Sequence, residues 1–142
     1  MNPMRTHVAG VMALACGGFL LAATPARAHH AFAAEFDAAK PVKLDGTITK
    51  IDFVNPHAWL YMDVKELDGK VVNWGVECSG PNALIRRGWR TDSVPPGTRV
   101  VINGYRAKNG QNLANGNDIR LPDGRVLFLG SSGSGAPYDK KP

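Results

Sequence analysis

The chain has 142 residues and carries 17 basic against 12 acidic side chains, a formal net charge of +5 at pH 7. Its only basic cluster, Arg86 and Arg87 with Arg90 nearby, is too small to follow a phosphate backbone, which argues against nucleic acid as a partner. Of the two cysteines, Cys16 lies in an N-terminal apolar segment. The folded part therefore has Cys78 alone and no internal disulfide.

The first 28 residues have the pattern of a signal peptide. Arg5 supplies the positive start, residues 8–23 form an uncharged apolar run, and Ala26-Arg27-Ala28 is the small-x-small pattern of a cleavage site. We expect cleavage between Ala28 and His29, and a periplasmic or secreted protein of 114 residues with a charge of about +3.

One other fate of this segment, lipid attachment, fits less well. Cys16 as a lipid-attachment site would normally have a leucine three residues before it, whereas Leu14 lies two before. No later apolar segment is long enough to cross a bilayer, so we expect no membrane span in the mature form.

Residues 29–40 read as an N-terminal arm, and a long strand follows. Val42, Leu44 and Ile48 share one parity, whereas Ile51 and Phe53 take the other. Because side chains alternate between the two faces of a strand, this change predicts a bulge near residues 49–50.

The next strand places a histidine beside aromatic residues. From residue 58 to residue 64 the even positions are apolar, whereas His57, Trp59 and Tyr61 share the opposite face. A third strand over residues 71–78 puts Cys78 on its apolar face. The pattern predicts that Cys78 is a small buried side chain and not a ligand.

The remaining elements complete the expected architecture. They are a short helix over residues 82–88, a strand over 98–107, a Gly/Asn-rich loop over 109–117, and strands over 118–121 and 125–129. This order predicts a mainly β protein, a small five- to six-stranded OB-like barrel with one short helix, over residues 41–129. A small open β-sandwich is the competing architecture. Residues 130–142, rich in Gly, Ser and Pro, are predicted to be a disordered tail.

Four stretches together resemble one family. They are His29-His30-Ala31-Phe32, Asn55-Pro56-His57-Ala58, residues 84–89 with their arginine pair, and Gly104-Tyr105-Arg106-Ala107-Lys108. The chain resembles a family of small exported bacterial proteins classed as a domain of unknown function. The resemblance implies export and a small β-barrel-like domain, and it implies no activity.

The mature N-terminus suggests a metal site. His29 would carry a free α-amine beside its own imidazole, and His57 would complete a three-nitrogen set that suits copper. In a variant of this hypothesis His30 replaces His57, because the amine, the intervening amide and the His30 ring can chelate Cu(II) together. The alternative without a metal is that both histidines follow the cleavage site by chance and bind nothing.

The function predicted first is therefore an exported copper-binding protein, with His29, His30 and His57 as metal ligands, that acts in binding, delivery or redox protection and not in turnover. The alternative is a non-metal module that binds a small ligand or another exported protein through the face with Trp59 and Tyr61. Arg86, Arg87 and Trp89 could add an anion-binding or partner surface to it. An oxygen-activating copper enzyme is a third hypothesis, but the sequence shows no extended substrate platform.

Overall fold

The computed structural model describes residues 32–131 and 134–139. The predicted signal peptide, its cleavage site, His29 and His30 lie outside these residues. The elements in chain order are α1 (Phe32–Glu35), β1 (Phe36–Asp52), β2 (Trp59–Lys65), β3 (Val71–Glu77), α2 (Pro81–Arg86), β4 (Arg99–Ala107), β5 (Leu113–Arg120), β6 (Val126–Phe128) and the 3-10 helix η1 (Pro137–Asp139).

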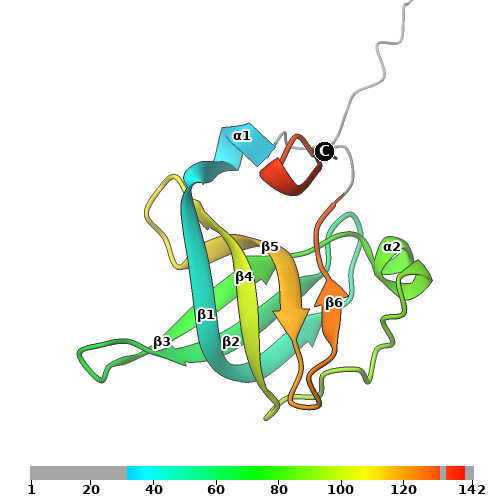
Figure 1. The fold of residues 1–142 in the computed structure, drawn as a ribbon, viewed down its shortest axis with the longest axis horizontal. Helices are drawn as coiled ribbons and strands as arrows, with labels where there is room; N and C mark the ends of the chain where they lie inside the picture. Colours follow the sequence, from blue (N-terminus) through cyan, green and yellow to red (C-terminus); the bar gives the residue numbers. More distant parts are fainter. Residues whose placement is uncertain (1–31, 132–133, 140–142) are drawn as a thin grey trace, which may run out of the picture.

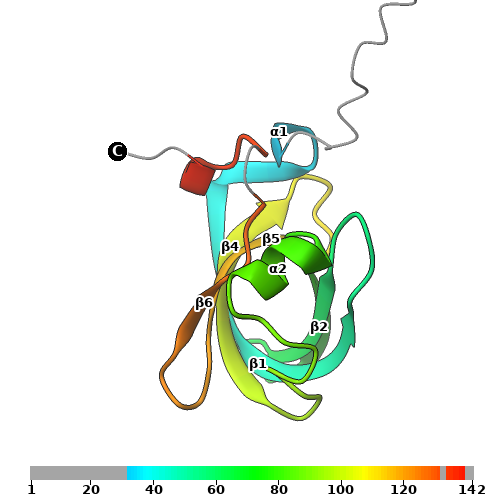
Figure 2. The same cartoon turned by 90° about the vertical axis from the view of Figure 1, so that its right-hand side faces the viewer.

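The six strands form one sheet in the order β3-β2-β1-β4-β5-β6, and an additional β3–β5 pairing closes the first five into a ring (Figure 1). The β3–β5 pair is parallel and the other pairs are antiparallel. Figure 2 shows the ring end-on, with α2 across its open end. Five strands closed in this order, with a helix between β3 and β4, confirm the predicted OB-like architecture in place of an open sandwich.

β1 is long enough to pair on both sides because it bends. Its pairing with β2 shifts register between Ile48 and Lys50, where the sequence predicted the bulge. Leu44 and Ile48 are buried before the shift, and Ile51 packs against the same core after it. The extra residue therefore keeps the apolar side of the strand inward through the change of parity.

The core fills the ring and extends under α2. Leu60, Met62 and Val76 are at most 1% exposed, and Trp74 is 5% exposed, as the alternation of β2 and β3 predicted. Trp89, which the sequence analysis grouped with the helix arginines, is 1% exposed and belongs to the same core.

β5 differs from the prediction. It begins at Leu113 and not at residue 118, so half of the predicted Gly/Asn-rich loop is strand. Gly116 is required there because a Cβ would lie 2.9 Å from side-chain atoms of Val76 and Leu129. Asn115 is buried and accepts a hydrogen bond from the Tyr138 hydroxyl at 2.6 Å. Contacts with distant residues thus stabilise a strand here, although Gly and Asn are residue types typical of a loop.

Both chain ends carry structure that the sequence did not predict. The described part of the arm forms α1 and then the first residues of β1, which starts at Phe36 and not at residue 41. In the range predicted to be a disordered tail, η1 forms one turn and Ala136 is fully buried. The reason is that apolar side chains of the two segments pack into one cluster. Figure 1 shows the C-terminal turn beside α1.

No helix among the described residues is long and apolar enough to cross a membrane.

Candidate functional site

His57 lies where the chain enters β2, just after the cis peptide bond between Asn55 and Pro56. The Ala58 amide donates to the carbonyl of Ser79 at 3.2 Å, and the Cys78 amide donates to the carbonyl of Ala58 at 2.9 Å. These two bonds continue the β2–β3 ladder beyond the ends of the strands. The backbone around His57 is therefore held by the two residues that follow β3.

The His57 ring has a defined orientation. Its Nδ1 lies 3.0 Å from the carbonyl oxygen of Cys78 and 3.6 Å from Oε1 of Glu77. A carbonyl oxygen only accepts, so Nδ1 carries the proton in this bond, and in the neutral ring the lone pair is then on Nε2. The side chains of His57 and Glu77 are 16% and 14% exposed, so the pair is largely shielded from water.

A row of four residues crosses the outer surface of the ring at this level. Trp59 on β2 pairs with Glu77 on β3, Glu77 pairs with Asn115 on β5, and Asn115 pairs with Tyr105 on β4. Neighbouring strands lie about 4.8 Å apart, so the backbones at Glu77 and Tyr105 are separated by about 10 Å. The row therefore runs from Trp59 and Glu77, near His57, to Tyr105, which Phe32 of the N-terminal arm contacts.

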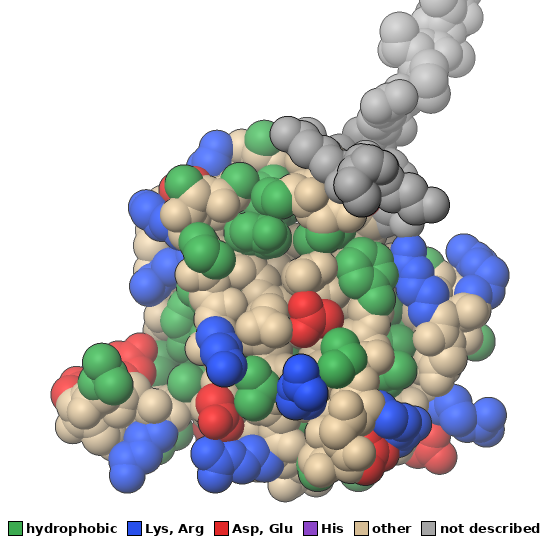
Figure 3. Space-filling view, viewed as in Figure 1, with side chains coloured by type: hydrophobic (Ala, Val, Ile, Leu, Met, Phe, Trp, Pro, Cys, Tyr) green, Lys and Arg blue, Asp and Glu red, His purple; other side chains and the backbone are tan. Residues whose placement is uncertain are grey.

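An apolar cluster ties the arm to this row. Phe32 is 4% exposed, and its ring meets the ring of Tyr105 edge-on at 5.4 Å between centroids. Tyr138, from the C-terminal segment, lies 6.4 Å from Tyr105 and donates its hydroxyl proton to Asn115. Burial raises the pKa of the Tyr138 hydroxyl, so it stays protonated and acts as a donor. In Figure 3 hydrophobic side chains gather just below α1.

Trp59 and Tyr61 share the outer face of β2, as their parity predicted. Their rings are stacked, with centroids 6.5 Å apart and planes 20° apart, and both are half-buried. A Cβ at Gly75 on β3 would lie 3.6 Å from the Tyr61 ring and 3.7 Å from the Trp59 ring. The two aromatics therefore cover a glycine of the neighbouring strand, and Trp59 also lines a cavity of about 330 Å³ beside α1.

The two arginines of the predicted partner surface have different environments. Arg86, at the end of α2, is exposed. Arg87 is half-buried, donates from Nη1 to the carbonyl of Gly130 at 2.6 Å, and lies 4.8 Å from the centre of the Phe128 ring. Arg87 therefore makes contacts within the chain at the point where the C-terminal segment leaves β6.

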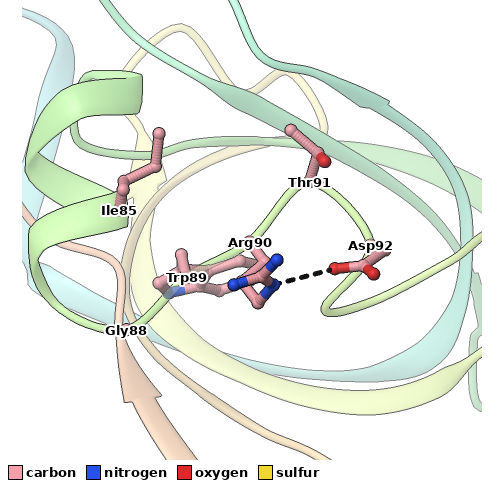
Figure 4. Close-up of a pocket in the computed structure, with 6 residues that line it drawn as sticks. All are labelled: Ile85, Gly88, Trp89, Arg90, Thr91 and Asp92. Carbon is pink, nitrogen blue, oxygen red and sulfur yellow. Dashed lines mark ion pairs between the residues drawn. The ribbon is translucent and has the colours of Figure 1, made fainter.

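A second cavity, of about 490 Å³, lies beside α2 (Figure 4). Arg90 and Asp92 face each other across part of its wall as an exposed ion pair at 3.7 Å. Trp89, which the sequence grouped with Arg86 and Arg87, lines this cavity, whereas His57, Trp59 and the two arginines do not. On the face shown in Figure 3 the basic side chains are interspersed with acidic ones and form no continuous stripe.

Cys78 is in the core, as predicted. Its side chain is 1% exposed, and burial raises the pKa of the thiol above its ordinary value. Among residues 32–131 and 134–139, no group of three or more His, Cys, Asp or Glu side chains lies close enough to hold a metal ion. His57 is the one predicted metal ligand whose surroundings the structure describes.

The sequence analysis did not identify the carbonyl that contacts His57 or two side chains of the row that continues from Glu77. The Cys78 carbonyl is a backbone group and leaves no trace in residue type. Asn115 had been placed in a loop, and Tyr138 in a disordered tail. A single tyrosine in a segment of Gly, Ser and Pro was the one available signal for the last of these.

Comparison with known proteins supports the resemblance noted in the sequence. Comparison with curated proteins and with solved structures gave no match. Residues 18–116 match the family described as "Family of unknown function (DUF6152)", and this range contains most of the ring of strands. The chain belongs to this family.

Proposed function

We propose that the protein is exported and binds a metal ion, copper above all, through His57 and the α-amine and ring of His29. The observation that carries the proposal is the contact of 3.0 Å between Nδ1 of His57 and the Cys78 carbonyl. Histidines that bind metals usually donate their other ring proton to a carbonyl or a carboxylate, which fixes the tautomer and the ring plane. His57 has the carbonyl, and the Glu77 carboxylate is nearby at 3.6 Å.

The anchoring of Phe32 supports the choice of His29 as the partner. Phe32 contacts Tyr105, which lies on the same outer surface as Glu77 and two strands away from it. His29 precedes Phe32 by three residues, and three residues span at most about 10 Å. The proposal requires that the mature terminus runs from this anchor toward His57, and the protein with an added alanine tests this requirement.

Nitrogen donors favour copper among the divalent first-row metals. An amine and two imidazoles offer three nitrogens, and the proposed set needs no thiolate. This fits the burial of Cys78 in the core. The proposed role is to bind or deliver the metal or to protect against its redox chemistry, and His30 gives the variant in which the terminus chelates without His57.

Calorimetric titration of Cu(II) into protein that begins at His29 tests the proposal. The same titration is run on a protein with one alanine added before His29, on His57→Ala and on Trp59→Ala. We expect tight one-to-one binding that weakens at least tenfold with the added alanine and with His57→Ala, and that Trp59→Ala leaves unchanged.

Two results would contradict this expectation in different ways. Equal binding by the proteins with and without the added alanine would rule out the amine as a ligand. Binding that needs the free terminus but survives His57→Ala would select the His30 variant.

One observation favours a second candidate function. Trp59, whose ring stacks on that of Tyr61, lines the cavity of about 330 Å³, whose wall also includes Phe36, Lys108 and Leu113. A half-buried aromatic wall with a polar rim is a common form of small-ligand site. Binding that is lost in Trp59→Ala and indifferent to the added N-terminal alanine would support this candidate.

A further inference from the structure

We infer that the cavity beside α2 binds a small carboxylate with an apolar body, which contacts the indole N–H of Trp89 and the guanidinium of Arg90. The inference uses neither His57 nor the mature terminus, so it does not depend on the proposed metal site. It assigns a ligand to a part of the chain that neither candidate function uses.

Trp89 brings an unpaired hydrogen-bond donor to the cavity. Its side chain is 1% exposed and belongs to the core, and part of it lines the cavity. Its Nε1 is buried and has no hydrogen-bond partner among the described residues. A buried donor without a partner costs free energy and is rare in native proteins, and an indole N–H can only donate. An acceptor atom of a ligand in the cavity would supply the missing partner.

The end of α2 fixes the position of Trp89 (Figure 4). Gly88 has a φ of 92°, a left-handed conformation that glycine adopts without strain, and its amide donates to the carbonyl of Ile85 at 3.0 Å. The Trp89 amide donates to the carbonyl of Leu84, also at 3.0 Å. The last turn of the helix therefore holds the backbone that carries the indole.

A short turn that follows Trp89 forms the rest of the wall. The Arg90 amide donates to Oγ of Ser93 at 2.8 Å, and the Ser93 amide donates to the carbonyl of Arg90 at 3.0 Å. Val94, the next residue, is fully buried. The turn thus lies between two buried side chains and is closed by its own hydrogen bonds. A wall that is ordered in advance reduces the conformational freedom that a ligand must remove.

The charges on the wall favour an anionic ligand. The Arg90 guanidinium stays charged and offers several donors in one plane, which matches the shape of a carboxylate. It lies 3.7 Å from Asp92, but the two side chains are 81% and 83% exposed, and such exposed ion pairs contribute little. A ligand carboxylate can therefore compete for Arg90. Because Asp92 repels negative charge, the single charge of a carboxylate fits better than the double charge of a phosphate group.

Ile85 offers a contact for the apolar body of the ligand. Its side chain lines the cavity and is 52% exposed, so a short aliphatic chain could cover it while the carboxylate contacts Arg90. The cavity volume of about 490 Å³ lies within the usual range of small-molecule sites. The lining thus combines apolar contact with hydrogen-bond donors, which is the chemistry that a small aliphatic acid requires.

Nuclear magnetic resonance titration of the mature chain that begins at His29 tests the inference. The chain has three tryptophans and therefore three indole N–H signals. Trp59→Phe and Trp89→Phe assign two of them, and the third belongs to Trp74. The probes are hexanoate, the neutral hexanamide and the cationic hexylammonium, all at constant ionic strength. The proposal requires that the Trp89 N–H is reachable from the cavity, and its signal reports this directly.

Three charge variants are titrated with hexanoate beside the parent protein. They are Arg90→Gln, Asp92→Asn and Arg86→Gln. Arg86 is the matched control, because it is an exposed arginine of α2 that does not line the cavity. All three substitutions change exposed side chains, so the core that holds Trp89 is kept.

We expect hexanoate to shift the Trp89 signal saturably, with a dissociation constant on the order of 1 mM, and to leave the Trp59 and Trp74 signals in place. Arg90→Gln should weaken binding about fivefold and Asp92→Asn should strengthen it about twofold, because one removes an attraction and the other a repulsion. Arg86→Gln should change the affinity less than twofold. Hexanamide should bind about fivefold more weakly than hexanoate, and hexylammonium should not bind.

Three results would overturn the inference. If hexanoate up to about 50 mM leaves the Trp89 signal unmoved, the cavity is not a site for this ligand class. Equal affinities for hexanoate and hexanamide would show that the carboxylate charge is not recognised. Equal losses in Arg90→Gln and Arg86→Gln would point to the general positive charge of the helix and not to the cavity. None of these results bears on Cu(II) binding, so the proposed function is tested separately.

Discussion

Cys78 orients the proposed metal ligand with its backbone while its side chain belongs to the core. Its carbonyl oxygen lies 3.0 Å from Nδ1 of His57, and its side chain is 1% exposed. The two roles come from the alternation of β3, which turns the thiol inward at the point where the ladder with the β2 entrance ends. Side-chain changes at Cys78 should therefore separate stability from metal binding.

The first prediction concerns Cys78→Ala. Removal of a small buried side chain should lower the free energy of unfolding by about 1 to 2 kcal/mol. Cu(II) affinity should stay within about twofold, because the carbonyl remains and the sulfur is not a ligand. Urea unfolding and calorimetry measure the two effects. A tenfold loss of affinity in a protein that remains folded would mean that the thiolate takes part in the site.

The second prediction is a pH dependence that arises from the same residue. Burial raises the pKa of the Cys78 thiol in the folded protein, whereas the unfolded chain loses this proton near pH 8.5. Above that pH the unfolded state binds fewer protons than the folded state, so the free energy of unfolding falls, by up to about 1.4 kcal/mol per pH unit.

Cys78→Ala lacks this contribution and serves as the control. Unfolding free energies of both proteins are measured between pH 7.5 and 10. The stability advantage of the parent over Cys78→Ala should shrink as the pH rises. A constant difference across the range would show that the thiol ionises equally in the two states.

The third prediction concerns Glu77, whose carboxylate lies 3.6 Å from Nδ1 of His57. Glu77→Gln keeps the shape but removes the negative charge beside the ring. Loss of such a partner usually costs 10- to 100-fold in metal affinity, and because the Cys78 carbonyl remains we expect about three- to tenfold. Calorimetry with Cu(II) measures the change.

Asp63→Asn is the matched control for Glu77→Gln. Asp63 is an exposed carboxylate on β2 that accepts a hydrogen bond from Asn73 at 2.8 Å. An equal loss of affinity in both variants would point to a general effect of net charge, and the specific role of Glu77 would be wrong.

Alternation of apolar and polar residues predicted most of the ring, because each long strand has one buried face. The bulge in β1 was readable because Ile48 and Ile51 cannot both point inward on a regular strand. β5 was only partly predicted, since the side chains that justify its Gly and Asn residues come from Val76, Leu129 and Tyr138. A local pattern carries no information about these partners.

The candidate site was predictable to the same extent. Parity placed His57 on the outer face with Trp59, and the structure describes both there. The contact with the Cys78 carbonyl could not be predicted, because any residue type presents the same backbone acceptor. The covering of the arm by Tyr138 depends on a pairing of the two chain ends, which periodicity within either end does not encode.

The last prediction compares two glycines at which an added Cβ would face opposite sides of the sheet, the core at Gly116 and the outer surface at Gly75. At Gly116 a Cβ would lie 2.9 Å from atoms of Val76 and Leu129, both fully buried, so Gly116→Ala should destabilise the protein by about 1 to 3 kcal/mol. At Gly75 the close contact is the end of the half-buried Leu113 side chain, which can move.

Gly75→Ala should therefore cost less than about 1 kcal/mol, because a β-strand favours alanine over glycine and offsets part of the strain. Urea unfolding of the two variants measures the difference. Because Trp59 and Tyr61 rest over Gly75 at ordinary contact distance, their fluorescence should change in Gly75→Ala more than in Gly116→Ala. A larger loss of stability in Gly75→Ala than in Gly116→Ala would contradict the prediction. It would mean that the outer surface around Trp59 and Tyr61 accommodates an added methyl group less readily than the core beneath β5.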